Sequence, residues 1–452
     1  MMVAIWWIRR DLRLTDNLTL QTALKSEEIL PVFILDPYFR TSETTRRYKF
    51  LINGLRKLDA DLRSRGSYLV FRSGNPLSVL RQLMNESGAQ MIYAEEDFTP
   101  YARQRDEAIA GKMPLRLVQG QLVHHPLGIQ KSDETPYSIY TPFSKAWKSF
   151  LPDDLDLSPP AEHIPTTPGI PSEGIPAFPI EEHFPVGETE TNKRLESFLA
   201  QCIYDYGQER NRLDLDGTST LSPHIHFGMM GLRTAVHHAR QAISTAPNPE
   251  SKKSAQTWLN ELIWREFYVH IMYHYPYVRG GSFRRQYDQL EWRNDPEEFE
   301  AWKHGLTGYP VVDAAMRQLL NTGWMHNRAR MIVASFLVKD LLIDWRWGER
   351  WFIQNLLDGD LAANNGGWQW TAGTGTDVAP YFRVFNPVLQ GKKFDPHGVY
   401  VKKWVPELAH LDQKTIHSPW EKSVGTPGYP APIVDHKFAR ERVLAAYKAI
   451  RK

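Results

Sequence analysis

The chain has little cysteine, no long apolar run and little net charge, and each shortage excludes some classes of protein. Its 452 residues include a single cysteine, Cys202, which excludes an internal disulfide and a cysteine-based zinc finger and favours a reducing, cytoplasmic compartment. No apolar run approaches the ~20 residues that a membrane-spanning helix requires. The formal net charge is only +2, so a nucleic-acid partner would have to be attracted by a local basic patch. What remains is a globular protein long enough for two or three domains.

The first third also lacks the common nucleotide fingerprints. Neither a G-x-G-x-x-G turn nor a Walker A lysine loop follows its first apolar run. What it has is alternation, in which amphipathic stretches such as 44–66 separate apolar runs. The runs typical of strands lie at 3–8, 29–36, 67–71, 90–95 and 115–119. This pattern predicts a doubly wound parallel sheet, whose ligands bind beyond the carboxyl ends of the strands.

The composition changes twice further along the chain. Prolines are so dense from about 152 to 195 that they exclude a regular helix and indicate an extended connector. After about 195 the pattern is nearly all helical, and it ends in a basic amphipathic helix with no extended tail. We therefore expect a Rossmann-like α/β domain over 1–130, a connector over 131–195 and an all-α domain over 196–452.

Two stretches of the helical part carry unusual polar residues. A helix is predicted at 257–276, and Glu261, Trp264, Arg265 and Tyr268 fall at i, i+3, i+4 and i+7, so they share one face. An acid, an indole, a guanidinium and a phenol together are unusual for a core. A Glu261–Arg265 pair beside a core tryptophan explains them about equally well.

The same helix holds two histidines one turn apart, His270 and His274. We interpret them as structural, because no third ligand is evident in the sequence, and we expect no metal site.

A second predicted helix, 323–342, contains Arg330, which is followed within thirty residues by Asp358 and Asp360. A buried arginine beside two acids is more often a structural ion pair than a site, although it can be both if a cofactor lies against it. The stretch from Asp358 to Trp370, "DGDLAANNGGWQW", fits neither element, because its glycine pair disfavours a helix and its asparagine pair disfavours a strand.

Hydroxyl side chains precede another predicted helix in "DGTSTLSPHIHFG", residues 216–228. Hydroxyls and free backbone N–H groups at a helix start can cradle an anion. A plain helix cap is the simpler alternative for this segment alone.

These segments together resemble the DNA photolyase and cryptochrome family. The resemblance runs in order along almost the whole chain, through "RRDLRLTDN", "GTSTLSPHIHFG", "WLNELIWREFY", "GYPVVDAAMRQLLNTGWMHNRARM", "DGDLAANNGGWQW" and "TGTDVAPYFRVFNPVLQGKKFDP". It is closest to the class I photolyases for cyclobutane pyrimidine dimers. It implies FAD in the helical domain and an antenna pigment near the α/β domain, where Asp97 is a candidate contact. Methenyltetrahydrofolate, an 8-hydroxy-deazaflavin and a second flavin all stay open as the antenna.

The resemblance implies flavin contacts and an electron path. The implied flavin contacts are Tyr206, Thr218, Ser219, Thr220, Leu221, Ser222, Arg330, Asp358, Gly359, Asp360 and Asn364. Asn364 would face the flavin N5, where an uncharged amide tolerates changes in flavin protonation; plant and animal cryptochromes carry Asp or Cys there. Arg330 would pair with Asp358 and help hold the reduced flavin as an anion. Trp368 would be the inner member of an electron-transfer row that continues outward through Trp345 and Trp292.

The resemblance also implies a pocket for damaged DNA. Its residues would be Arg210, Glu261, Trp264, Arg265, Asn327, Arg328, Met331, Trp370 and Gln390, with Lys392 and Lys393 as weaker candidates for the DNA backbone. Trp264 and Trp370 would wall the pocket, and Glu261 would stabilise the pyrimidine carbonyls as charge develops. Asn327 and Met331 stand where photolyases for (6-4) photoproducts have histidines, which favours cyclobutane dimers.

The implied function is light-dependent DNA repair by a monomeric deoxyribodipyrimidine photo-lyase. Excited, reduced FAD would donate one electron to a flipped-out pyrimidine dimer, the ring would split, and the electron would return. A cryptochrome-type blue-light receptor and a (6-4) photolyase are the alternatives, and Asn364, Met331 and the missing tail count against the receptor. A third alternative, independent of the resemblance, is a nucleotide-binding α/β protein with a helical interaction domain.

Overall fold

The computed structural model of the chain describes residues 2–42, 45–179, 183–377, 380, 382–421 and 426–450. The chain forms two compact units, each of which we describe by itself. Unit 1 comprises Met1–Tyr137, Thr141–Tyr204 and Ser219–Tyr273, and unit 2 comprises Ser138–Tyr140, Asp205–Thr218 and His274–Lys452. The chain thus passes between the units more than once, whereas the three-part division at 130 and 195 is continuous in sequence and stays a prediction.

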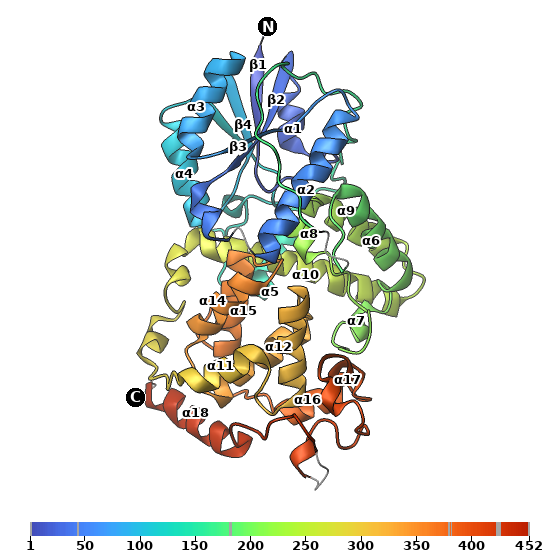
Figure 1. Cartoon of the computed structure of the whole chain (residues 1–452), viewed down its shortest axis with the longest axis vertical. Coiled ribbons are helices and arrows are strands. Elements are labelled where there is room, and N and C mark those ends of the chain that lie inside the picture. Colours follow the sequence, from blue (N-terminus) through green and yellow to red (C-terminus); the bar gives the residue numbers. More distant parts are fainter. Residues whose placement is uncertain are drawn as a thin grey trace. The chain divides into compact units, whose positions relative to one another are not determined.

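Unit 1 is built on a five-stranded parallel sheet with the order β3-β2-β1-β4-β5 (Figure 1). Its strands are β1 (Val3–Ile8), β2 (Glu28–Leu35), β3 (Val70–Ser73), β4 (Met91–Glu95) and β5 (Leu115–Val118). All five predicted strands are confirmed, with some shifted ends. β1 pairs with β2 in the register Val3 to Glu28 and with β4 in the register Ala4 to Met91. The strand order reverses between β1 and β4, so the doubly wound parallel fold is confirmed, with a ligand-binding edge expected at that crossover.

Helices cover both faces of this sheet, and their ends follow from local sequence. They are α1 (Leu18–Ala23), α2 (Arg46–Arg63), α3 (Pro76–Ser87) and α4 (Pro100–Ala110). Figure 1 shows α1 and α2 on one side and α3 and α4 on the other. The Asn75 side chain accepts a hydrogen bond from Ser78 N at the start of α3, and Gly88 ends that helix at φ +70°. All six residues of β1 are buried, which explains its continuous apolar run.

The remainder of unit 1 is the proline-rich stretch and further helices. The helices are α5 (Tyr140–Ser149), α6 (Glu188–Gln201), α8 (Ser222–His226), α9 (Leu232–Ser244) and α10 (Pro249–His274). From 152 to 179 the chain has no helix and no named strand, as its prolines predicted, although Thr166 forms an isolated parallel bridge with Ile29. Residues 180–182 of the predicted connector lie outside the described residues. The helix predicted at 257–276 is confirmed as the second half of α10.

Unit 2 contains helices joined by loops and no named strand among its described residues, as predicted for this part of the chain. Its α-helices are α7 (Tyr206–Glu209), α11 (Pro296–His304), α12 (Pro310–Thr322), α13 (Asn327–Ser335), α14 (Trp345–Asn355), α15 (Leu361–Ala372), α16 (Pro387–Phe394), α17 (Val399–Trp404) and α18 (His436–Ile450). A π-helix, Phe336–Asp340, continues α13. The largest cluster of buried apolar residues lies here, and α12 and α13 supply much of it.

Two local predictions for unit 2 are wrong. The helix predicted at 323–342 starts only at Asn327, because Gly323 ends α12 at φ +69° and the His326 side chain accepts from Arg328 N to start α13. The stretch from Asp358, for which no helix was predicted, is helical from Leu361 onward. One carboxylate oxygen of Asp360 accepts from the first free N–H groups of α15, at 3.0 Å each. This cap and the burial of one helix face outweigh the ~1 kcal/mol that each glycine costs in a helix interior.

Candidate functional site

Helix α15 has one buried face and one half-exposed face. The buried face consists of Asn365, Trp368, Gln369 and Ala372, at helical spacing. The half-exposed face consists of Ala363, Asn364, Gly366, Gly367 and Trp370. A β-carbon placed on Gly367 would meet no atom within 4 Å. A helix face with so little side-chain bulk, flanked by an amide and an indole, can accept a flat molecule against its backbone.

Glu349 on α14 orients the amides of α15. The Asn364 Nδ2 donates to the backbone oxygen of Glu349 at 3.0 Å, and the Asn365 Nδ2 donates to the Glu349 Oε1 at 2.8 Å. A backbone carbonyl can only accept, so the nitrogen of Asn364 must face Glu349 and its oxygen must face away. Among the described residues no group donates to that oxygen. Burial is the main cause that raises the pKa of Glu349, and the bond from Asn365 opposes it. Sequence reasoning missed Glu349, because nothing in "GER" marks it.

Arg330 and Asp358 form the predicted ion pair, which is confirmed. The Arg330 Nη2 lies 2.8 and 3.1 Å from the two carboxylate oxygens of Asp358, and the Arg330 Nε donates to Met325 O at 2.8 Å. Asp358 is buried, whereas the Arg330 side chain is about a quarter exposed, at 26%. The guanidinium is therefore fixed from two sides and still reaches the surface of unit 2.

The three predicted electron-transfer tryptophans all contribute to one core. Trp368 and Trp345 are buried in the main cluster of unit 2, and Trp292 packs half-buried against it. The Trp368 ring covers Gly348, where a β-carbon would lie 2.1 Å from the ring. This gradation from buried to half-buried agrees with a row that leads outward, and its role in electron transfer stays a prediction.

In unit 1, α10 presents the predicted polar face. Glu261, Trp264, Arg265 and Tyr268 are half-buried, while the residues between them are buried, so the shared face is confirmed. The Trp264 ring lies 5.5 Å from the rings of Phe267 and Tyr268, measured between centroids. The helix thus holds an indole rigidly next to an acid and a guanidinium.

The buried side of α10 carries an acid, Glu266, that ties this helix to other segments of unit 1. Its carboxylate accepts from the Trp147 indole N–H and from Val123 N, each at 2.5 Å. Burial raises the pKa of Glu266 to about 7 despite these hydrogen bonds. Sequence reasoning missed Glu266, because its partners are distant along the chain and polar contacts of that kind leave no periodic signal.

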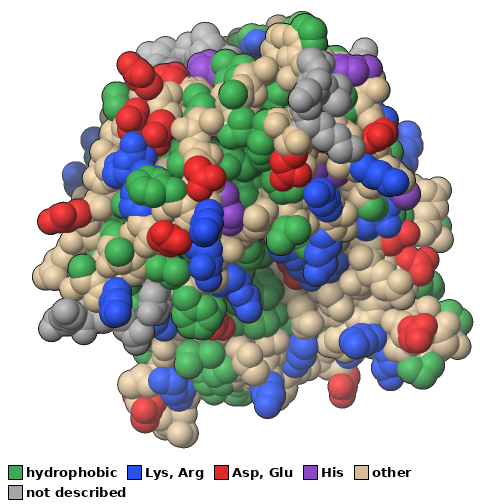
Figure 2. All heavy atoms as spheres, turned by 90° about the horizontal axis from the view of Figure 1, so that it is seen from below, with side chains coloured by type: hydrophobic (Ala, Val, Ile, Leu, Met, Phe, Trp, Pro, Cys, Tyr) green, Lys and Arg blue, Asp and Glu red, His purple; other side chains and the backbone are tan. Residues whose placement is uncertain are grey.

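Basic side chains gather in unit 2 near the start of α13. Arg328 donates twice to the Asn211 Oδ1, at 2.6 and 3.1 Å, and stacks over Phe394 at 4.5 Å. Arg210 lies over the Tyr206 ring at 5.6 Å. Asn327 is exposed and Met331 half-buried on the same helix, while Gln390 is half-buried on α16 and Lys392 and Lys393 are exposed. Figure 2 shows basic and acidic side chains interspersed on the face seen from below.

His326 precedes the predicted lesion contact Asn327. Burial, followed by the charges of Arg328, Arg330 and Arg210, lowers the pKa of His326 to about 4. Its Nδ1 accepts from Arg328 N at 3.1 Å. His326 is therefore neutral near pH 7 and is not an acid on this side of the site.

The predicted phosphate-binding hydroxyls are distributed over both units. Thr218 ends a segment of unit 2, and Ser219 to Ser222 belong to unit 1, just before and at the start of α8. Thr220 adopts φ +49°, and its hydroxyl accepts from Arg194 and donates to Ser219 O. Hydroxyls before a helix are thus confirmed, while their contact with FAD stays a prediction.

The carboxyl edge of the sheet in unit 1 carries charged and aromatic side chains. Asp97, which follows β4, accepts from Thr99 N at 2.9 Å. Burial pushes the pKa of Asp97 upward, but Arg10 and Arg9 outweigh it and hold that pKa below its usual value. Tyr38 is half exposed and stacks on Tyr101 at 3.8 Å between ring centroids. An aromatic pair at this edge is suited to contact a planar pigment. That an antenna pigment binds here stays a prediction.

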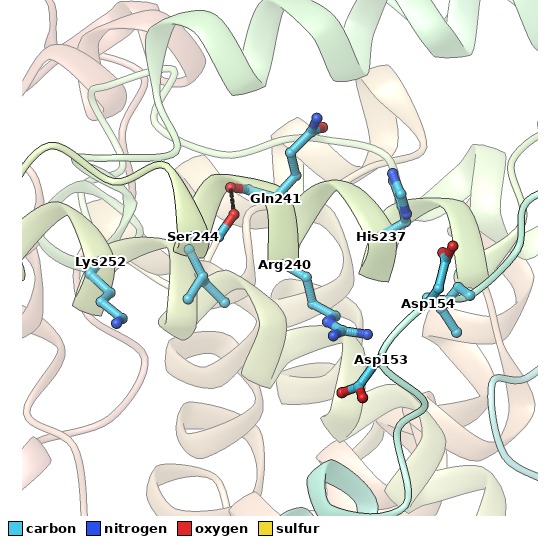
Figure 3. Close-up of a pocket in the computed structure, with 9 residues that line it drawn as sticks. Asp153, Asp154, His237, Arg240, Gln241, Ser244 and Lys252 are labelled. Carbon is cyan, nitrogen blue, oxygen red and sulfur yellow. Dashed lines mark hydrogen bonds between the residues drawn. The ribbon is translucent and has the colours of Figure 1, made fainter.

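A pocket of about 520 Å³ in unit 1 is separate from these residues (Figure 3). Asp153, Asp154, His237, Arg240 and Lys252 are among its lining residues, and no predicted site residue belongs to it. Its mixed charges favour no particular ligand. Within the described residues, no group of three His, Cys, Asp or Glu side chains could hold a metal ion.

Comparison with known proteins decides the family. Residues 4–166 match the family described as DNA photolyase, and residues 258–449 match the FAD binding domain of DNA photolyase. A deoxyribodipyrimidine photo-lyase of Synechococcus sp. is 41% identical over 472 residues, which cover 99% of this chain and 96% of the relative. The chain belongs to the DNA photolyase family. The predicted family and the flavin-binding helical domain are thereby confirmed.

Solved photolyase structures share the whole fold. A class III photolyase from Agrobacterium tumefaciens superposes with a TM-score of 0.92 at 36% identity and covers 100% of this chain and 98% of its own. A cryptochrome from Synechocystis sp. superposes with a TM-score of 0.89 at 29% identity, covering 99% of each chain. The photolyase fold class is confirmed. Assignment to class I stays a prediction, since the first of these structures is a class III enzyme. No helix in the described ranges is long and apolar enough to cross a membrane.

Proposed function

We propose that this photolyase-family chain repairs UV-damaged DNA in a light-dependent reaction that splits cyclobutane pyrimidine dimers, as a deoxyribodipyrimidine photo-lyase. The observation that carries the proposal is the α15 face. There the fold turns the Asn364 carbonyl outward beside Gly367, whose missing side chain leaves open space. An amide oxygen is a neutral acceptor, which suits a cofactor whose protonation changes during a reaction cycle.

The residues present fit FAD. The outward oxygen of Asn364 and the backbone at Gly367 suit the edge of a flat ring, and the Arg330 guanidinium, fixed by Asp358, suits a negative charge on it. The hydroxyls of Thr218, Ser219, Thr220 and Ser222, with Tyr206, Leu221, Gly359 and Asp360, would hold the remainder. When bound and reduced, FAD supplies a light-driven donor of one electron. The protein's part is to position that donor, exclude water and maintain its charge.

The residues that we propose for lesion binding lie on α10 in unit 1 and on α13 and α15 in unit 2. Trp264 and Trp370 replace the stacking that a flipped dimer loses, and the Glu261 carboxyl hydrogen-bonds the pyrimidine carbonyl on which charge develops. Arg265, Asn327 and Met331 complete the contacts with the bases. Because Asn327 and Met331 cannot transfer a proton in the required range and His326 is neutral, the pocket suits cyclobutane dimers rather than (6-4) photoproducts.

DNA would be held through phosphates by Arg210, Arg328 and Gln390. The Arg328 guanidinium is already oriented by Asn211 and Phe394, so little side-chain entropy is lost when a phosphate binds. We propose that the enzyme acts as a monomer in the cytoplasm, with a second pigment bound near the edge marked by Asp97. Trp368, Trp345 and Trp292 would return electrons to oxidised cofactor and would take no part in the repair step itself.

The experiment compares two lesions on the same enzyme. Reduced holoenzyme is mixed with oligonucleotides that carry either a cyclobutane dimer or a (6-4) photoproduct, illuminated with blue or near-ultraviolet light, and the products are separated. We expect light-dependent restoration of the cyclobutane substrate alone, with a dark sample as the control. Restoration of the (6-4) substrate would contradict the pocket assignment. Restoration of neither would favour a cryptochrome-type blue-light receptor, since a cryptochrome from Synechocystis sp. shares the fold.

A further inference from the structure

Arg346 lies against the middle tryptophan of the predicted row. Its guanidinium carbon is 4.9 Å from the centroid of the Trp345 ring. Hydrogen bonds fix this position: the Arg346 Nη2 donates to Asp288 at 2.7 Å, the Nη1 donates to Asp344 at 3.1 Å, and the Nε donates to Gly280 O at 3.2 Å. The place of this positive charge relative to the ring is therefore set by the fold.

Trp345 is in a position where a nearby charge matters. Its side chain is fully buried in the main cluster of unit 2, and no described residue accepts a hydrogen bond from its indole N–H. An oxidised Trp345 would therefore keep its proton and carry a full positive charge in a dry environment. Coulomb interactions are strong there because little water screens them. The guanidinium in ring contact opposes oxidation of Trp345, and the paired carboxylates of Asp288 and Asp344 partly offset its charge.

The outer tryptophan has different surroundings. Trp292 is half-buried at the border of the cluster, so water can solvate a positive charge on it. The neighbouring Arg293 is engaged with Glu298, at 2.7 Å. Trp345 and Trp292 thus differ in how well their surroundings stabilise a positive charge on the ring.

We propose that Arg346 directs charge outward by making Trp345 a poorer place for positive charge than Trp292. The inference rests on the proposed function of the tryptophan row. In that row one electron leaves Trp368 for the photoexcited oxidised cofactor, Trp345 refills Trp368, Trp292 refills Trp345, and a thiol in solution refills Trp292. Within the described residues, the ring of this row that Arg346 contacts is Trp345. It shortens the time for which the positive charge rests on Trp345.

The carboxylates of Asp288 and Asp344 act in the same direction as the loss of the Arg346 charge when Arg346 is replaced. Replacing Arg346 by glutamine removes a cation from the ring of Trp345 and also removes the ion pairs of Arg346 with Asp288 and Asp344, although Asp288 keeps Arg285 at 3.6 Å. Both changes make Trp345 easier to oxidise. The positive charge then stays on Trp345 longer, and recombination with the electron on the cofactor competes better.

The experiment is flash photolysis of the full chain with oxidised FAD bound and a thiol present. The decay of the tryptophan radical-cation absorption and the yield of stable photoreduction are both measured. Arg346→Gln should lower the yield several-fold and lengthen the radical-cation signal, approaching the behaviour of Trp292→Phe. Arg350→Gln is the matched control, because it changes the same charge at an exposed position on the same helix and should leave both readings unchanged. Arg346→Lys keeps the charge and should stay near the parent in both.

The possible outcomes distinguish the proposed role of Arg346 from the proposed electron transfer through the three tryptophans. If Trp368→Phe blocks photoreduction while Arg346→Gln matches Arg350→Gln, the row stands and the role of Arg346 is wrong. If Arg346→Lys loses as much yield as Arg346→Gln, hydrogen bonding rather than charge is responsible, and the inference is again overturned. If Trp368→Phe photoreduces at the parental rate, the tryptophan row and the role of Arg346 are both wrong. Flavin content, read from the absorption spectrum of each variant, controls for damage to the fold.

Discussion

Replacing Gly348 by alanine would force a methyl group against one edge of the Trp368 ring. The new β-carbon would lie 2.1, 2.5 and 2.6 Å from three ring carbons, whereas ordinary contacts begin near 3.4 Å. The ring must therefore retreat by roughly 1 Å, although Trp302 and Phe352 already pack against it at centroid distances of 6.1 and 5.0 Å. Overpacking of this kind costs about 1–3 kcal/mol. We expect the free energy of unfolding to fall by that amount and photoreduction of bound FAD to slow.

Urea denaturation followed by fluorescence measures the first effect, and illumination of the oxidised holoenzyme measures the second. For the stability measurement, Gly367→Ala on α15 is the matched control, since its β-carbon would meet nothing within 4 Å. Helix propensity should raise its stability by up to ~1 kcal/mol. The added methyl group would occupy the face proposed for FAD, so its flavin content should fall. A Gly348→Ala protein that unfolds and photoreduces like the parent would refute the packing argument.

Four further results are expected. Trp368→Phe should reduce photoreduction of oxidised flavin to near zero but spare repair by enzyme already reduced, as measured by absorption changes and dimer splitting. Glu261→Ala should lower the repair yield per absorbed photon more than it lowers DNA affinity, because its hydrogen bond strengthens as charge develops; equal losses would make it a binding residue only. Removal of Arg210 or Arg328 should reduce the slope of log affinity against log salt by about 1, measured by DNA titration at several salt concentrations. The pKa of Glu266 is about 7 in the folded chain against an ordinary value of 4.5, so the folded state binds the extra proton. The free energy of unfolding should fall by up to roughly 3 kcal/mol as pH rises from 4.5 to 7, and Glu266→Gln should remove this dependence in urea titrations.

Continuous apolar patterns made the sheet predictable. All six residues of β1 are buried, so the run "VAIWWI" has no polar position to obscure it, and the same holds for most of β2. The shared face of Glu261, Trp264, Arg265 and Tyr268 was predictable for the related reason that helical spacing alone sets it.

The helix α15 was not predictable from local preference. Its glycine and asparagine pairs disfavour regular structure, and the forces that overcome them are the Asp360 cap and the burial of Trp368 against Gly348, which belongs to another helix. Tertiary contacts of that kind are invisible to a local reading.

Glu349 and Glu266 were missed for the same reason. Trp147 and Glu266 are 119 residues apart, and a single glutamate carries no sign of a distant indole donor. Resemblance to a family located Asn364, but only the structure gives the direction in which its amide points.

That direction limits how the family could change at position 364. The carbonyl of Glu349 belongs to the backbone, so no mutation at position 349 alone can convert it to a donor. An aspartate that arose at position 364 would set a carboxylate oxygen against this carbonyl, unless it took up a proton or turned away. A change from the amide to the acid found in plant cryptochromes would thus require either a new protonation state or a new side-chain orientation at the same step. The identity of the side chain at position 364 and its protonation or orientation would therefore change in a single mutation.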